Sequence, residues 1–390
     1  MMMTWVGCLL AVCGAGKADL DADIVARSVV DMGNTARLQC VMAKARRGEP
    51  VTIGVIGGSI TQGALASAPE KCWGALTADW WRAAFPKAQV TFVNAGIGAT
   101  CSDLGAHRVG SHLLSKKPDV VVVEYAVNDA INPLAAETLE GLLRQILCTP
   151  NTPAVILFFT MGKDGNSRQE EHVRVGRHYG LPMASLKDAL WPEVQSGRIP
   201  WTDFEADDVH PNDLGHHYSA QLIGGLLDRV KVALAPDDQS IATIPPIPAP
   251  LISDLFEHTQ LYNAASITPS RNEGWEKTAE DPFFGAGWKA IQPGSVIEFE
   301  IEGKAVSLLT WRIKGPMGRA EAWVDNGQPI KLEGWFDATW GGFMPFQLMA
   351  RDLNPGKHTL HVRLLEERDA QSTGNAFQIH AVMSAGLARP

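Results

Sequence analysis

Positive charge is scarce in this sequence. Lys and Arg number 34 against 43 Asp and Glu, which gives a formal net charge of -9 at pH 7. The densest basic run, Lys44 to Arg47, falls at the end of an expected helix, where cations interact favourably with the helix dipole. Because nucleic acids are bound largely through phosphate contacts to basic side chains, we expect no nucleic-acid partner.

Long apolar runs are also missing. No run reaches the roughly 20 residues that a membrane-spanning helix needs, so we expect no membrane partner. The short apolar run Trp5 to Val12, followed by Gly16-Lys17-Ala18, is typical of a signal peptide, although no Lys or Arg precedes it. Residues 1–19 are therefore a candidate signal or leader segment. We expect a secreted or periplasmic protein, with a cytoplasmic one as the alternative.

Cofactor-binding motifs are sparse as well. The six cysteines show no C-x-x-C spacing, and Cys8 and Cys13 lie in the candidate leader, so we expect buried thiols with at most one disulfide. There is no His-Glu-x-x-His pattern, and no Gly-Lys-Ser/Thr follows the glycine-rich segments. These absences argue against a zinc site of that type and against a phosphate-binding loop. We expect no metal and no other cofactor.

The length of 390 residues exceeds one ordinary core, and 45% apolar content suffices for two. Residues 20–240 alternate strand-like and helix-like segments, which predicts an α/β domain with a parallel, doubly wound, flavodoxin-like sheet. Residues 241–252 are rich in proline and are expected to form an extended linker. Residues 253–390 alternate with period two and predict an all-β, jelly-roll-like sandwich. Nothing in the sequence indicates an oligomeric state.

The individual elements follow from periodicity. One or two amphipathic helices are expected between Leu20 and Gly48. Further helices are expected at about 73–85, 102–115, 135–147, 168–179 and 213–233. Strands are expected at 51–56, 90–93, 120–125 and 154–160, and beyond the linker at 295–301, 305–313, 319–324, 358–365 and 376–383.

The segment from Val51 to Gly63 holds the first candidate for chemistry. Its β-branched run predicts a buried central strand, and Gly57-Gly58 permits a sharp turn that leaves Ser59 at the carboxyl end of the strand. A hydroxyl there, with its own N–H facing the same space, can attack a carbonyl and help to bind the resulting oxyanion. A helix N-cap or an anion-binding loop has the same pattern, so this segment alone leaves the role of Ser59 open.

Three further segments follow expected strand ends, where open α/β sheets bind ligands. The glycine-rich segment Asn94 to Thr100 lets backbone N–H groups approach a ligand, and Asn128 places an amide after the strand 120–125. Asp207 precedes His210 by three residues, so its carboxylate can hold the imidazole Nδ1 and leave Nε2 to act as a base. Each segment also suits an ordinary turn, and the segment around His210 also offers metal ligands, which we consider the weaker interpretation.

In their order, the four segments resemble the sequence blocks of the SGNH/GDSL hydrolase superfamily over residues 50–220: Gly-x-Ser, a glycine block, Asn-Asp and Asp-x-x-His. The resemblance implies a cofactor-independent serine esterase. By that likeness Ser59 is the nucleophile, His210 the general base and then acid, and Asp207 its orienting carboxylate. Ala126 stands where the superfamily usually has glycine, which implies only a changed backbone contact.

The same resemblance assigns an oxyanion hole. Its donors would be the Ser59 N–H, the Gly98 N–H and the side-chain amide of Asn128. The glycine block also contains Gly96 and Ala99, which stay open as alternatives to Gly98.

The carboxy-terminal part guides the expectation for the substrate. Its tryptophans are Trp275, Trp288, Trp311, Trp323, Trp335 and Trp340. Trp311 and Trp323 lie in expected strands and are expected in the core, whereas Trp335 and Trp340 belong to an aromatic, glycine-rich segment and are candidates for stacking on sugar rings. A hydrolase joined to a sandwich also resembles esterases that deacetylate plant polysaccharides. We therefore expect a carbohydrate O-acetylesterase acting on hemicellulose-type glycans. The alternatives are a lipid or thioester acylhydrolase and a non-catalytic glycan-binding protein.

Overall fold

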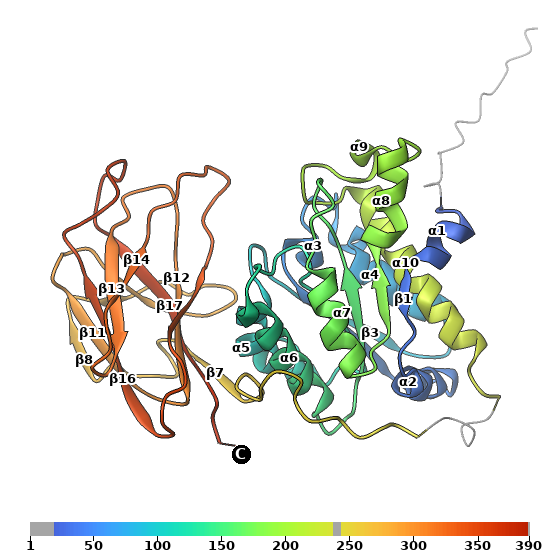
Figure 1. The fold of residues 1–390 in the computed structure, drawn as a ribbon, viewed down its shortest axis with the longest axis horizontal. Coiled ribbons are helices and arrows are strands. Elements are labelled where there is room, and N and C mark those ends of the chain that lie inside the picture. Colours follow the sequence, from blue (N-terminus) through green and yellow to red (C-terminus); the bar gives the residue numbers. More distant parts are fainter. Residues whose placement is uncertain (1–18, 237–242, 389–390) are drawn as a thin grey trace, which may run out of the picture.

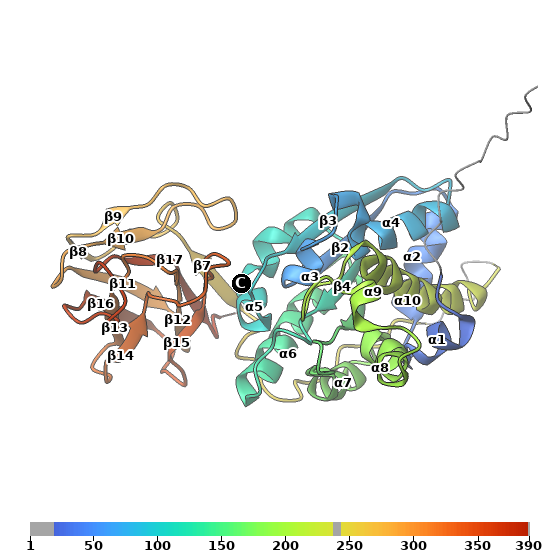
Figure 2. The ribbon, with the colours of Figure 1, turned by 90° about the horizontal axis from the view of Figure 1, so that it is seen from above.

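The computed structural model describes residues 19–236 and 243–388. The predicted leader lies outside this range apart from Asp19, and so do residues 241 and 242 of the predicted linker. An α/β part and an all-β part lie side by side, with α5 and α6 facing the β part in both views (Figures 1 and 2). The domain limits at residues 240 and 253 stay a prediction. Within the described residues, no helix is long and apolar enough to cross a bilayer.

A six-stranded sheet with strand order β1-β6-β5-β4-β2-β3 forms the centre of the α/β part. Its parallel strands are β2 (Val51–Gly57), β3 (Val90–Gly96), β4 (Val120–Glu124), β5 (Ala154–Phe159) and β6 (Met183–Ser185). The short β1 (Val29–Asp31) pairs antiparallel with β6 at one edge. The parallel strands follow the flavodoxin-like order, in which the second strand along the chain lies at the edge beside the first, so the predicted fold class is confirmed.

Helices cover both faces of this sheet, which is why β4 and β5 are buried along their whole length. One face packs against α2 (Ala36–Arg46), α4 (Trp73–Ala84), α8 (Leu186–Ser196) and α10 (Asp213–Val232). The other face packs against α5 (Ser102–His112), α6 (Pro133–Leu147) and α7 (Gln169–His178). The remaining α-helices are the short α1 (Ala22–Arg27), α3 (Ser59–Gln62) and α9 (Trp201–Phe204), and two 3-10 turns are η1 (Pro69–Lys71) and η2 (Leu114–Lys116). The region expected to be helical from Leu20 to Gly48 thus also contains β1.

Two antiparallel sheets form the β part, which confirms the predicted sandwich. One sheet has the order β15-β12-β17-β10-β9, with β7 paired to β17, and the other has the order β14-β13-β16-β11-β8. Apolar side chains from both sheets, among them Phe299, Leu308, Leu360 and Ile379, form the core between them. The strands are β7 (Thr259–Tyr262), β8 (Arg271–Glu273), β9 (Glu276–Lys277), β10 (Trp288–Ala290), β11 (Val296–Glu302), β12 (Ala305–Thr310), β13 (Arg319–Val324), β14 (Ile330–Glu333), β15 (Phe346–Ala350), β16 (Lys357–Leu364) and β17 (Phe377–Ala385).

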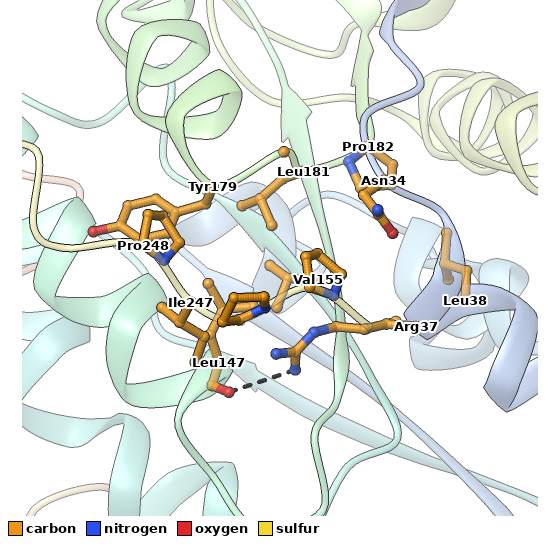
Figure 3. A pocket seen from close by; sticks show the side chains of 14 residues that line it. Asn34, Arg37, Leu38, Leu147, Val155, Tyr179, Leu181, Pro182, Ile247 and Pro248 are labelled. Atoms are coloured by element: carbon orange, nitrogen blue, oxygen red, sulfur yellow. Dashed lines mark hydrogen bonds between the residues drawn. The ribbon is translucent and has the colours of Figure 1, made fainter. Parts of the chain in front are cut away.

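The proline-rich segment after α10 lies against the α/β part (Figure 3). Its prolines leave residues 243–250 without helix or strand. Pro245 to Pro248 and Leu147 line a small cavity of about 30 Å³ beside α2. The guanidinium of Arg37 closes one side by donating to the carbonyl oxygens of Leu147 (3.4 Å) and Pro153 (3.1 Å). Arg144 donates to the carbonyl oxygen of Pro248 (2.8 Å), so the segment is held along the surface by packing and by a hydrogen bond.

Helix α6 anchors the chain where it enters the β part. The buried carboxylate of Glu140 accepts hydrogen bonds from the backbone N–H groups of Ile252 (2.8 Å) and Ser253 (3.0 Å). Arg144 forms a buried ion pair with Glu257 (2.9 Å). A side chain at Gly141 would collide with Phe256, so only glycine permits this close approach. These contacts fix the sandwich beside α5 and α6.

Candidate active site

Ser59, His210 and Asp207 form one chain of hydrogen bonds. The Oγ of Ser59, the first residue of α3 after β2, lies 2.9 Å from Nε2 of His210. The Nδ1 of His210 lies 2.8 Å from Oδ2 of Asp207. Because a carboxylate only accepts hydrogen bonds, Nδ1 carries the proton and Nε2 is left to accept one from the Ser59 hydroxyl. The structure thus brings together the three residues that the sequence singled out, in an arrangement that can remove a proton from Ser59.

The carboxylate of Asp207 is held by its own loop. Its Oδ1 accepts hydrogen bonds from the backbone N–H groups of Val209 (2.8 Å) and His210 (2.7 Å). Partial burial works to raise the pKa of Asp207, but the hydrogen bonds from the His210 imidazole and from these N–H groups outweigh it and lower the pKa below its ordinary value. Asp207 is therefore ionised at neutral pH and keeps the imidazole in one tautomer.

The loop between α9 and α10 that carries Asp207 and His210 is tied down at three points. The Trp201 indole N–H donates to the carbonyl oxygen of Asp207 (2.8 Å), and the Ala206 N–H donates to that of His210 (2.8 Å). The Lys163 ammonium pairs with Asp208 (2.8 Å). These contacts hold the imidazole in place before any ligand arrives.

Glu205, two residues before Asp207, is a buried carboxyl that no sequence motif indicates. It is 5% exposed, and its Oε2 has no hydrogen-bond partner within the described part of the chain. Burial, and next the charge of Asp207, raise the pKa of Glu205 to about 9. Glu205 is therefore neutral at physiological pH, so it adds no second negative charge beneath the His210 loop.

Asn128 lies directly beside the turn that precedes Ser59. A Cβ at Gly58 would come within 2.5 Å of the Asn128 Oδ1, so glycine is required there for the amide to approach. The Sγ of Cys101 donates to the carbonyl oxygen of Asn128 (3.1 Å), which fixes its backbone. Asn128 and Ser59 line the same cleft, and the side-chain NH2 of Asn128 makes no hydrogen bond to any described residue.

The predicted donor Gly98 is already engaged. Its N–H donates to Oε1 of Gln62 (2.8 Å), a residue that the sequence analysis did not single out. In the same segment the Gly96 N–H donates to Oδ1 of Asn94 (2.8 Å). The N–H of Ala99, by contrast, bonds to no described residue, and Ala99 has a left-handed φ of +55°. Gln62, Gly98 and Ala99 all line the cleft at Ser59.

Buried polar side chains fix the strand ends that carry these groups. The Arg108 guanidinium donates to the carbonyl oxygen of Gly57 (3.0 Å) and also bonds the Ala95 carbonyl, which joins the ends of β2 and β3. Asp129 accepts from the Ser102 N–H (2.7 Å) and pairs with Nε2 of His172 (3.0 Å). The turn after β4 is thereby held at a fixed distance from Ser59.

Both parts of the chain contribute to the cleft around Ser59, which has a volume of about 770 Å³. Trp340, which is 63% exposed, lines it and packs edge-on against Phe336 at 5.3 Å between ring centroids. Trp335 does not line it: this side chain is 7% exposed and packs against Met317 and Ala376. The two tryptophans that the sequence grouped as candidates for stacking therefore lie in different environments.

Two other tryptophans lie in environments that differ from those expected. The expected strand 305–313 ends at Thr310, so Trp311 leaves the sheet and lines the cleft instead of the core. Trp323 lies in β13 but points outward and stacks on His361 at 4.9 Å. From the sandwich, Asp281 and Phe283 also line the cleft. A motif search does not find these residues, because only the packing of the two parts brings them to Ser59.

Near His210, other side chains of the types that bind metals form ion pairs with residues of the protein itself. Asp213 pairs with Lys71 (2.7 Å), and His217 pairs with Asp19 (2.8 Å). Within residues 19–236 and 243–388, no group of three or more His, Cys, Asp or Glu side chains is arranged to hold a metal ion.

Comparison with known proteins gives three findings. The model of the GDSL-like lipase/acylhydrolase family matches residues 55–218. Two solved structures, both described as a two-domain esterase (CEX) active on acetylated mannans, are 33% identical to this chain and cover 94% of it and 99% of their own chain. Their TM-scores are 0.86 for the crystal with mannopentaose and 0.87 for the other. A comparison with curated proteins gave no match.

Proposed function

Because this chain belongs to the GDSL-like lipase/acylhydrolase family, we propose that it is a serine-dependent esterase that removes O-acetyl groups from carbohydrates. The observation that carries the proposal is the contact between the Ser59 Oγ and His210 Nε2, 2.9 Å, in a cleft that Trp340 also lines. A nucleophile with its base is what ester hydrolysis requires, and an exposed aromatic ring beside it is suited to a sugar.

In the proposed reaction, His210 Nε2 takes the hydroxyl proton as the Ser59 Oγ attacks the carbonyl carbon of an acetyl group. The tetrahedral intermediate collapses as His210 protonates the departing sugar hydroxyl, which leaves an acetyl-serine. His210 next takes a proton from water, the hydroxide attacks the acetyl carbonyl, and acetate departs as His210 returns the proton to Ser59. Asp207 stays ionised throughout and stabilises the imidazolium.

The oxyanion would be bound by the Ser59 N–H, by the amide of Asn128 and by one N–H of the segment Gly98-Ala99. Gly98 can serve only if Gln62 releases it, since that N–H donates to Oε1 of Gln62 in the free protein. The Ala99 N–H needs no such release. Each well-placed donor contributes about 3 to 4 kcal/mol of transition-state stabilisation.

Support for a carbohydrate substrate comes from the relatives and from the cleft. The two-domain esterase at 33% identity is active on acetylated mannans, and the alignment extends over both parts of this chain. An acetylated hemicellulose-type glycan is the proposed substrate. Such polymers do not cross a membrane, so we also propose that the chain is secreted or periplasmic and that residues 1–19 direct its export.

The test is acetate release from acetylated mannan and xylan oligosaccharides. We expect release by the wild type and by Ser115→Ala, a substitution at an exposed serine in the 3-10 turn Leu114–Lys116 that follows α5, but not by Ser59→Ala or His210→Ala. Equal rates for Ser59→Ala and Ser115→Ala would refute the mechanism. A steep preference for long acyl chains over acetate would refute the carbohydrate substrate and favour a lipid acylhydrolase.

A further inference from the structure

A second cavity adjoins the catalytic cleft and lies wholly in the β part. Its volume is about 850 Å³. Trp311 and Asp281 line both this cavity and the cleft at Ser59, so the two spaces adjoin at those residues. We call this second space the sandwich cavity.

Paired strands supply the floor of the sandwich cavity. Lys289 on β10 lies directly opposite Gln378 on β17 in the antiparallel ladder, so both side chains project from the same face of the sheet. His380 follows Gln378 by two residues and lies on that face as well, and all three line the cavity. Polar groups capable of hydrogen bonding thus form a row on a rigid strand pair.

His380 has two ring nitrogens in different environments. It is 4% exposed, and its Nδ1 has no hydrogen-bond partner within the described residues. The Gln378 amide lies 3.1 Å from Nε2 of His380. Burial lowers the pKa of His380, so the imidazole is neutral at pH 7. If Gln378 donates to Nε2, the proton of the neutral ring is on Nδ1, a buried N–H without a partner among the described residues.

An aromatic side chain stands beside this donor. The Trp311 ring centroid lies 5.5 Å from that of His380, and Trp311 is half-buried between the sandwich cavity and the cleft. An aromatic ring next to hydrogen-bonding groups suits a ligand with an apolar face and several hydroxyls. Sugar rings have both features.

The charges of the cavity favour a neutral ligand. Its lining includes the carboxylates of Glu276, Glu280 and Asp281 against the ammonium groups of Lys277 and Lys289. Lys277 is in addition bonded to the carbonyl oxygen of Ala264 (2.9 Å). The excess of carboxylates opposes a uronate-rich chain.

We propose that the sandwich cavity binds neutral main-chain sugars that continue from the acetylated residue held at Ser59. The inference rests on the proposed function and deepens it, since it makes the protein an esterase for oligomers and polymers rather than for single acetylated sugars. Gln378 and Lys289 bind hydroxyl groups in this scheme, His380 holds the Gln378 amide, and Trp311 lies where the chain passes from one space to the other.

The kinetic test compares chain lengths. The substrates are acetylated manno-oligosaccharides of one to six residues, with 4-nitrophenyl acetate as a substrate that cannot reach the sandwich cavity. We expect the wild-type kcat/KM to rise about tenfold from the monosaccharide to the pentasaccharide. Gln378→Ala and Lys289→Ala should remove most of that rise by increasing KM for the longer substrates. Both variants should leave kcat unchanged, and also kcat/KM for the monosaccharide and for 4-nitrophenyl acetate. Lys289 is exposed and Gln378 half-buried, so neither change disturbs the core as a change of His380 would.

Matched controls are Gln260→Ala on β7 and Lys357→Ala on β16, exposed residues outside the cavity, which should behave as the wild type. The proposal would be overturned if kcat/KM depended on chain length equally in Gln378→Ala, Lys289→Ala and both controls. It would also be overturned if kcat/KM of the wild type did not depend on chain length. Calorimetry with Ser59→Ala should detect binding of unacetylated mannopentaose but no binding of pentagalacturonate. Equal binding of both would contradict the preference for a neutral ligand. Failure of the proposed function is distinct from these outcomes, because the wild type would then not hydrolyse 4-nitrophenyl acetate.

Discussion

The side-chain Oε1 of Gln62 accepts a hydrogen bond from the backbone N–H of Gly98 at 2.8 Å. Gln62 is the last residue of the short helix that begins at Ser59, so one short helix places both the nucleophile and this acceptor at the cleft. The contact fixes the start of the Gly98-Ala99 turn and keeps the Gly98 N–H occupied. The N–H of Ala99 is then the group of this turn that is open to a ligand.

Replacing Gln62 by glutamate should therefore impair catalysis in a pH-dependent way. The carboxylate of Gln62→Glu would keep the bond to Gly98 and add a negative charge beside the developing oxyanion, which should lower kcat about tenfold or more at pH 7. An ordinary glutamate is protonated below about pH 4.3, so the ratio of wild-type to variant kcat should narrow at acidic pH. The measurement is kcat on 4-nitrophenyl acetate from pH 4 to 8, with Gln260→Glu as the remote control. A ratio independent of pH would contradict the assigned position of Gln62.

Asp207→Asn should lower kcat by about a thousandfold or more. An asparagine amide can donate to the Nδ1 of His210, which favours the tautomer with a proton on Nε2, and that tautomer cannot accept the proton of Ser59. The matched control is Asp203→Asn, because Asp203 is an exposed carboxylate on α9, four residues before Asp207. Circular dichroism of both variants should match that of the wild type. Equal kcat values for the two variants would show that Asp207 does not orient His210.

The residues predicted from sequence are those whose placement is local. Ser59 and Asn128 follow buried apolar strands directly, and Asp207 and His210 are three residues apart in one turn, so strand periodicity and short spacing suffice to place them. The same periodicity predicts the central strands and most of the long helices, but it misses the helix Leu186–Ser196. It fails for β1 and β6, which have three residues each and are too short to show a period.

The rest of the site depends on contacts between distant segments. Gln62 and Gly98 are 36 residues apart, and Trp311 and Asp281 reach the cleft only because α6 anchors the sandwich beside it. Trp335 and Trp340 are in one short segment, yet the first turns into the core and the second toward Ser59. Composition and spacing carry no information about such side-chain directions.

Glu205 should make the stability of the protein depend on pH. The unfolded chain loses this proton near the ordinary glutamate pKa, whereas the folded chain retains it up to a pKa of about 9. Since the folded state then binds more protons, the free energy of unfolding should fall by about 1.4 kcal/mol per pH unit between those values from this group alone. Glu205→Gln removes the titration, so its Tm should rise relative to the wild type from pH 5 to pH 8. The control is Glu302→Gln, which is exposed on β11, and parallel Tm curves for all three proteins would contradict the burial effect.

Substitution of Trp340 should affect substrate binding, whereas substitution of Trp335 should affect stability. Trp340 is 63% exposed, so Trp340→Ala should leave Tm nearly unchanged, raise KM for acetylated oligosaccharides about tenfold and spare 4-nitrophenyl acetate. Trp335 is 7% exposed and packed against Met317 and Ala376, so Trp335→Ala should lower the free energy of unfolding by about 3 to 5 kcal/mol. The measurements that test both expectations are thermal unfolding and steady-state kinetics of the two variants. If Trp340→Ala bound oligosaccharides as tightly as the wild type, the exposed ring would not be a sugar contact, and the substrate would have to be held by the other residues that line the cleft.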